Sequence, residues 1–156
     1  MTHDLRVERV YDAAPELVFG AFTDPEAQHE MYADEPDWIV RSECDLRVGG
    51  RWTIEFGPPA GPPSRETCVF EIIERPRLLV FRSTMSMPDG SSLATRTHVT
   101  FTQTVSGQTR LTVVQTGFPA TGLRDEFTEG WGRILAGLSR VVAARTAGTS
   151  GSGPAA

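Results

Sequence analysis

The apolar positions near the carboxyl end of the chain repeat with the period of a helix. Between residues 123 and 145, large apolar side chains recur three or four positions apart: Phe127, Trp131, Leu135, Leu138 and Val142. This spacing places them on one side of an α-helix, and that side must be buried against another element. Because the preceding segments have the pattern of strands, we expect a long helix packed on the face of a sheet.

The chain before this helix shows the two-residue alternation of half-buried strands, interrupted by turn residues. Seven strands are predicted, over residues 5–11, 38–46, 51–56, 66–74, 78–85, 94–104 and 109–117. Most links between them are short, which favours antiparallel neighbours. In the link over residues 48–51, Gly49 and Gly50 supply the positive backbone angles that a tight hairpin requires.

Two short helices are predicted between the first and second strands. One covers residues 15–22, and the other covers residues 25–31 and begins at the cap and first-turn pair Asp24-Pro25. Residues 147–156 are rich in Gly, Ser, Thr, Pro and Ala, so we expect a disordered tail. The pattern therefore predicts one α+β domain over residues 1–146.

Charged residues indicate which face of the sheet points to water. If Glu55, Glu71 and Arg82 point outward, alternation turns a largely aromatic set toward the long helix. That set is Trp52, Ile54, Phe56, Phe70, Ile72, Phe81, Met85, Val99, Phe101, Leu111 and Val113. The polar residues expected on the same face are uncharged: Ser83, Thr95, Thr97 and Gln115. Such a face forms a core or, where the helix does not fill it, an apolar cleft of the kind that binds ligands.

Composition and charge narrow the possible partners. The 156 residues carry a net charge of -5, which disfavours binding to nucleic acid and to anionic membranes. No apolar stretch approaches the ~20 residues of a membrane span, and residues 1–9 are too polar for a signal peptide, so we expect a cytoplasmic protein. The chain contains no lysine, which excludes a lysine Schiff base and a phosphate-loop lysine.

No residue pattern predicts a catalytic or metal site, and we expect no cofactor. Cys44 and Cys68 lack the spacing of metal ligands and are expected to be isolated thiols. His98 shares its strand alternation with Arg96 and is expected to face outward, whereas His29 is expected to be solvated on the second short helix.

Two glycines flank Trp131 inside the long helix, although each costs roughly 1 kcal/mol relative to alanine in such a position. Two explanations are open for Gly130 and Gly132. Either the helix backbone packs closely against another element, or the missing side chains leave room for a ligand beside Trp131.

Several segments at the joints between elements resemble those of the START-like or SRPBCC proteins, in the branch named after the activator of the ninety-kilodalton heat-shock protein ATPase. The resemblance covers about residues 7–142. The segments that carry it are Ala14-Pro15-Glu16-Leu17-Val18-Phe19, Phe22-Thr23-Asp24-Pro25-Glu26, Asp45-Leu46-Arg47-Val48-Gly49-Gly50-Arg51-Trp52, Glu71-Ile72-Ile73-Glu74-Arg75-Pro76-Arg77-Leu78 and Gly130-Trp131. It implies a helix-grip fold, in which a curved antiparallel sheet surrounds a long carboxyl-terminal helix. Met31-Tyr32 stands where the family often has tryptophan, which implies a differently shaped pocket mouth.

The resemblance and the aromatic inner face together predict a cavity that binds a small, largely apolar molecule. The candidate ligand-binding residues are Trp38, Trp52, Phe56, Phe70, Phe81, Met85, Gln115, Phe118 and Trp131. Gln115 and Ser83 are expected to orient a polar end of the ligand. A monomer and a homodimer are both compatible with the sequence.

Two alternative functions stay open. One is a co-regulator of a chaperone ATPase, acting through the acidic loop at residues 34–37 or the proline-rich loop at residues 58–63. The other is an enzyme similar to polyketide cyclases and aromatases, which requires a charged or titrating side chain inside the cavity. The predicted inner face supplies no such side chain.

Overall fold

The computed structural model describes residues 1–151, with side chains described as far as residue 148. The strands are β1 (His3–Tyr11), β2 (Ile39–Cys44), β3 (Arg51–Gly57), β4 (Ser64–Glu74), β5 (Leu78–Ser86), β6 (Ser92–Gln103) and β7 (Thr109–Phe118). The helices are α1 (Pro15–Phe22), the 3-10 helix η1 (Pro25–Ala27), α2 (Gln28–Tyr32) and α3 (Thr121–Gly151). Of the predicted disordered tail, residues 147–151 instead continue α3, and residues 152–156 lie outside the described residues. No described helix is long and apolar enough to cross a membrane.

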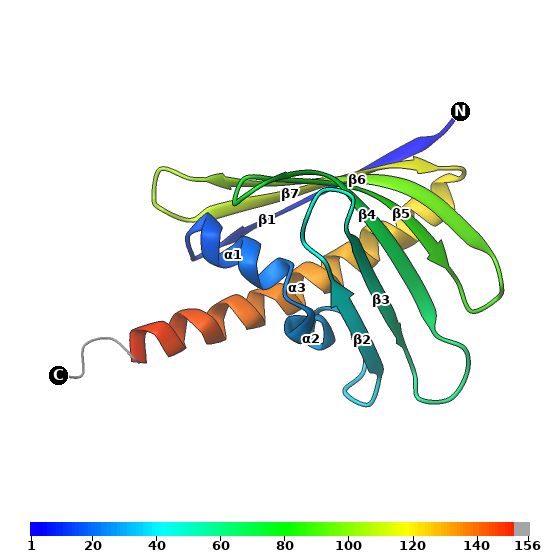
Figure 1. The fold of residues 1–156 in the computed structure, drawn as a ribbon, viewed down its shortest axis with the longest axis horizontal. Coiled ribbons are helices and arrows are strands. Elements are labelled where there is room, and N and C mark those ends of the chain that lie inside the picture. The colour runs from blue at the N-terminus through cyan, green and yellow to red at the C-terminus, as the bar shows by residue number, and fades with distance from the viewer. Residues whose placement is uncertain (152–156) are drawn as a thin grey trace.

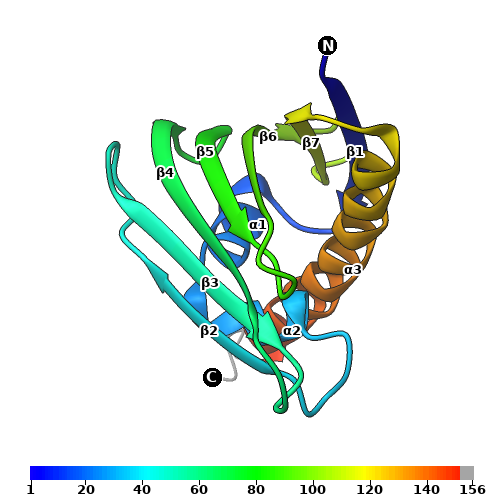
Figure 2. The same ribbon diagram turned by 90° about the vertical axis from the view of Figure 1, so that its right-hand side faces the viewer.

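The seven strands form one antiparallel sheet in the order β1-β7-β6-β5-β4-β3-β2. The sheet bends into an open arch, and α3 runs along its concave side (Figures 1 and 2). In Figure 2, α3 lies next to β1 at one flank of the arch, and the strands β2 to β4 form the other flank. This arrangement confirms the predicted α+β class and the helix-grip fold.

The apolar stripe of α3 is buried as the spacing predicts. Trp131, Leu135, Leu138 and Val142 are buried, and α3 packs against β1, β7, α1 and α2. The buried hydroxyl of Tyr11 in β1 donates a hydrogen bond to the carbonyl oxygen of Leu135 at 2.8 Å. A directional bond thus adds to apolar burial in fixing the position of α3 on this flank of the sheet.

The short helix α1 fills one end of the space between the sheet and α3. The ring of Phe22 lies between Trp52 of β3 and Trp131 of α3, with centroid distances of 5.6 Å and 6.4 Å. Phe19 and Phe22 also contact the ring of Phe101 on β6. This half of the concave side is therefore a close-packed aromatic core.

A bulge in β4 makes one predicted inward position wrong. Phe70 lies opposite Phe81 of β5, but Ile72 already lies opposite Val80, so the alternation shifts between these two positions. Ile72 consequently points outward and is 37% exposed, while Ile73 packs against the core in its place. The alternation rule fails here because the bulge adds one residue to β4 only.

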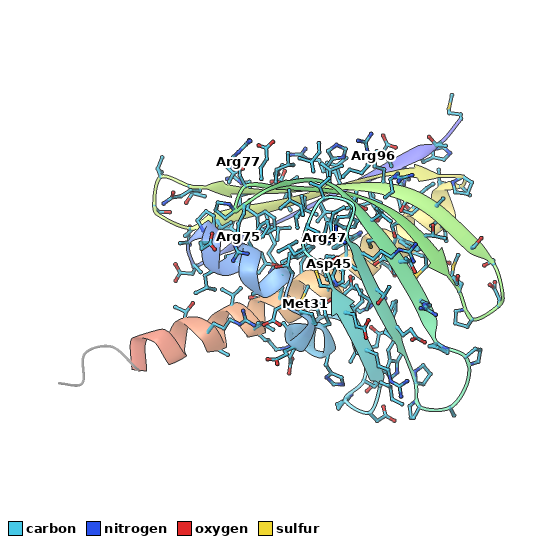
Figure 3. The ribbon with its side chains drawn as sticks, in the orientation of Figure 1. Met31, Asp45, Arg47, Arg75, Arg77 and Arg96 are labelled. Atoms are coloured by element: carbon cyan, nitrogen blue, oxygen red, sulfur yellow. The ribbon has the colours of Figure 1, made fainter. Side chains whose placement is uncertain are left out.

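The outer face of the sheet carries charge, as predicted. The Glu71 carboxylate forms ion pairs with Arg96 at 2.9 Å and with Arg82 at 3.4 Å. Figure 3 shows Arg96 on the side of the sheet that faces away from α3. His98 follows the alternation of Arg96 and shares this face, where it lies opposite Val80 and Val114.

The glycines of α3 have very different surroundings. A Cβ atom on Gly137 would lie 2.1 Å from the carbonyl oxygen of Glu30 and 2.8 Å from the Cα atom of Met31. Glycine at 137 is therefore what allows the backbone of α2 to reach α3. A Cβ atom on Gly130 or Gly132 would meet nothing within 4 Å, so close packing does not explain these two glycines.

We predict that Gly137→Ala destabilises the protein by about 1–3 kcal/mol, because its methyl group requires the backbones of α2 and α3 to separate. The matched control is Gly132→Ala, which introduces the same methyl group at an exposed position of the same helix. This control should stabilise the protein by up to roughly 1 kcal/mol through helix propensity. Denaturant unfolding of both variants measures the difference, and similar effects would contradict the close approach at Gly137.

Candidate ligand-binding site

The concave side contains a cavity at the end that α1 does not fill. Its volume is about 500 Å³, and its walls come from β3, β4, β5 and β7, from α2 and the loop after it, from the loop between β5 and β6, and from the first half of α3. The wall is mainly apolar. Its large apolar side chains are those of Met31, Tyr32, Trp38, Phe56, Met85, Met87, Pro88, Phe127, Trp131 and Ile134. A cavity of this kind is the usual form of a small-molecule site.

Five of the nine predicted site residues lie together in this wall. Trp38, Phe56, Met85, Gln115 and Trp131 line the cavity. They come from three strands, the loop before β2 and α3, so only the bending of the sheet around α3 brings them together. Their role in binding stays a prediction.

The other four predicted residues do not line the cavity. Trp52 is buried beneath Phe22, and its ring stacks on Phe70 at 6.0 Å and meets the edge of Phe81 at 5.9 Å. Phe118 is fully buried at the end of β7, where its ring contacts the ring of Phe127 on α3. These four side chains are part of the aromatic core next to the cavity.

A buried chain of hydrogen bonds fixes the orientation of two wall residues. The indole nitrogen of Trp131 donates to Oε1 of Gln115 at 2.7 Å, and Nε2 of Gln115 donates to Oγ1 of Thr95 at 2.8 Å. All three side chains are buried. Because both ends of the amide are engaged, Gln115 serves first to hold Trp131 in place.

One residue of the site, Glu66 of β4, was not predicted from the sequence. Its side chain lines the cavity and is only 9% exposed. Oε2 accepts a hydrogen bond from the hydroxyl of Ser83 at 2.7 Å, and Ser83 itself does not line the cavity. Oε1 accepts no hydrogen bond from any residue within the described chain. The expectation of an uncharged inner face is therefore wrong.

A sequence signal for Glu66 did exist. Glu66 alternates in step with Cys68 and Phe70, which both point inward. The predicted strand began at Glu66, where a charged residue is expected in water, whereas β4 begins at Ser64. Glu66 is thus an interior position of the strand, paired with Ile54 on β3 and with Met85 on β5.

Burial sets the protonation of the groups around this carboxyl. Desolvation raises the pKa of Glu66, and the hydrogen bond from Ser83 offsets part of that rise. Burial, followed by the nearby charge of Glu66, also raises the pKa of the Tyr32 hydroxyl and of the Cys68 thiol well above their usual values. The hydroxyl and the thiol therefore stay protonated, and Glu66 is the group of this cluster that changes charge most readily.

The mouth of the cavity is acidic. Asp34, Asp89 and Glu126 line it, together with one cation, Arg133 of α3. The guanidinium of Arg133 lies 3.1 Å from the carboxylate of Asp34, so its charge is largely matched within the protein. Over the described residues, no group of three or more His, Cys, Asp or Glu side chains is arranged to hold a metal ion.

Residues 12–143 match the family described as Activator of Hsp90 ATPase homolog 1-like protein. The chain therefore belongs to this family, whose START-like helix-grip fold is the one described above. No curated protein matches the chain.

Solved structures of similar proteins agree with this assignment. Protein CV1439 from Chromobacterium violaceum is 25% identical, with a TM-score of 0.77 over 89% of this chain and 96% of that one. Protein Mll3558 from Rhizobium loti is 25% identical, with a TM-score of 0.73 over 90% and 96%. Protein NE0264 from Nitrosomonas europaea is 23% identical and shares the fold, with a TM-score of 0.74 over 92% and 96%.

We predict that Glu66→Gln gains stability relative to the natural protein as pH rises above 4.5, the ordinary pKa of a glutamate. Because the folded state raises the pKa of Glu66, it binds the proton more tightly than the unfolded state, so the free energy of unfolding falls as pH rises through that range. Glutamine cannot ionise and avoids this loss, and its amide oxygen can still accept the bond from Ser83.

Denaturant unfolding of both proteins, from pH values below 4.5 to neutrality, measures this difference. Glu43→Gln, which removes an exposed carboxylate from β2, is the control for the change in net charge. If the stability difference between Glu66→Gln and the natural protein does not change with pH, the burial of an ionisable Glu66 is contradicted.

Proposed function

We propose that the protein binds a small, largely apolar molecule in the cavity between the sheet, α2 and α3. The observation that carries this proposal is the cavity itself, whose volume of about 500 Å³ and mainly apolar wall match those of small-molecule sites. Burying apolar ligand surface there contributes about 25 cal/mol per Å² before the costs of association.

The polar groups of the wall support selective binding. Trp131 is held by Gln115, and Glu66 is held by Ser83, so neither has to be ordered when a ligand enters. Preorganised groups of this kind lower the entropic cost of binding. The ligand is therefore expected to place its polar end near Glu66 and its apolar body along the aromatic wall.

Gly130 gives further support. It lies one helical turn from Phe127 and from Ile134, which both line the cavity, and Gly130 itself is part of the wall. A side chain here would meet no protein atom within 4 Å and would extend into space that a ligand could use. This favours the second explanation of the glycine beside Trp131.

A second candidate is an enzyme that transfers protons, as a cyclase or aromatase must. The observation in its favour is Glu66, because a carboxylate with a raised pKa inside an apolar cavity is a suitable general base. It would remove a proton from a carbon next to a carbonyl group, while the protonated hydroxyl of Tyr32 donates to the developing oxyanion.

For the binding function, we predict that Gly130→Phe weakens the binding of the neutral fluorescent probe N-phenyl-1-naphthylamine by about tenfold or more, because the new ring occupies the cavity. The matched control, Gly132→Phe, adds the same ring to an exposed position outside the wall and should leave binding unchanged. A fluorescence titration measures both affinities. Absence of binding to the natural protein, or equal losses in the two variants, would contradict the proposal.

For the enzymatic candidate, we predict that the natural protein accelerates deuterium exchange at the carbon atoms next to the carbonyl of 2-tetralone in heavy water. Glu66→Gln should retain binding of the ketone but lose the acceleration, since an amide cannot accept the proton. Mass spectrometry measures the exchange, and calorimetry measures the binding. Exchange at the buffer rate in the natural protein, despite bound ketone, would exclude this carbon-acid chemistry.

A further inference from the structure

We infer that the cavity selects cationic ligands: molecules with an apolar body and a protonated amine or quaternary ammonium group, whose charge is held by the Glu66 carboxylate among aromatic side chains. This inference rests on the proposed binding function and names the chemical class of its ligand. Three observations carry it: an unmatched carboxylate, an aromatic wall and an acidic mouth.

The first observation is that the carboxylate of Glu66 lacks a cationic partner. It is nine-tenths buried, and within the described part of the chain it takes part in no ion pair. Its neighbours across the sheet are the apolar side chains of Ile54 and Met85. A buried carboxylate is costly unless a positive charge accompanies it. Glu66 lines the cavity, and its one hydrogen bond to a described residue leaves Oε1 without a donor.

The second observation is the aromatic wall around this carboxylate. The rings that line the cavity belong to Tyr32, Trp38, Phe56, Phe127 and Trp131. Tyr32 and Phe56 pack against each other with ring centroids 5.2 Å apart. Burial, followed by the nearby charge of Glu66, raises the pKa of the Tyr32 hydroxyl, which places Tyr32 close to this carboxylate. Aromatic faces attract cations, and aromatic side chains combined with a carboxylate suit an ammonium group.

The third observation is the charge of the mouth. Glu126 and Asp89 are exposed there and form no ion pair with any described residue, whereas the third acid, Asp34, forms an ion pair with Arg133. Hydrogen bonds from Ser91 lower the pKa of Asp89, so that it stays ionised. The excess negative charge attracts a cation and repels a carboxylate such as that of a fatty acid.

Protonation of Glu66 should compete with the ligand. The titratable groups that face it are Tyr32 from α2 and Cys68 from its own strand, and both stay protonated. The hydroxyl of Ser83 faces it from β5, and the charged groups of the mouth are those named above. An ammonium ligand therefore binds more weakly as pH falls through the raised pKa of Glu66, and it releases a proton when it binds below that pKa.

The test compares three ligands that share one apolar body: 2-naphthylmethylamine, 2-naphthylmethanol and 2-naphthoic acid. Calorimetry at neutral pH should give an affinity for the amine about tenfold or more above that for the alcohol, and the weakest affinity for the acid. Glu66→Gln should remove the preference for the amine over the alcohol, because the amide carries no charge to match the ammonium group. Glu43→Gln, which removes one exposed carboxylate that does not line the cavity, should behave like the natural protein.

Each remaining outcome decides a different claim. Binding of the alcohol without a preference for the amine, or a preference that survives Glu66→Gln, overturns this inference and leaves the binding function intact. If the preference for the amine disappears in high salt, it comes from the exposed acids of the mouth, and the role of Glu66 is contradicted. Binding of none of the three ligands would count against the binding function and against this inference together.

Discussion

The burial of α3 against one flank of the sheet determines where the rest of the structure can leave space. The bond from Tyr11 to Leu135 holds α3 to β1, and Gly137 lets the backbone at Glu30 pack directly on the helix. A helix held in this way cannot also cover β3, β4 and β5 along their whole length. The ring of Phe22 closes one end of the remaining space, and the other end is the cavity.

Glu66 gives this cavity its chemical character. In a core it would be an unfavourable residue, since a buried carboxylate with one hydrogen bond from Ser83 is incompletely compensated. Beside a cavity the same carboxylate becomes a specific contact for a ligand, because the ligand can supply the missing charge. The chaperone-related function suggested by the family name would instead use the loops at residues 34–37 and 58–63, and it stays a prediction of the resemblance alone.

The sequence allowed most of the fold to be predicted, because alternation and helical periodicity report which side of each element is buried. It could not show which inward aromatics form core and which line the cavity. That division depends on where Phe22 packs against Trp52, a contact between segments far apart in the chain. Ile72 was misplaced because a bulge breaks the alternation. Glu66 was missed because the rule that charges face water outweighed its correct alternation with Phe70.

The most direct test of this account is an NMR titration that follows the carboxyl carbon of Glu66, assigned by the loss of its signal in Glu66→Gln. The account predicts that, in the protein alone, this carboxyl titrates above the ordinary value of 4.5, and that saturation with 2-naphthylmethylamine moves its titration to lower pH. A carboxyl that titrates at the ordinary value and does not respond to the amine would contradict both the burial of Glu66 and its role in the cavity.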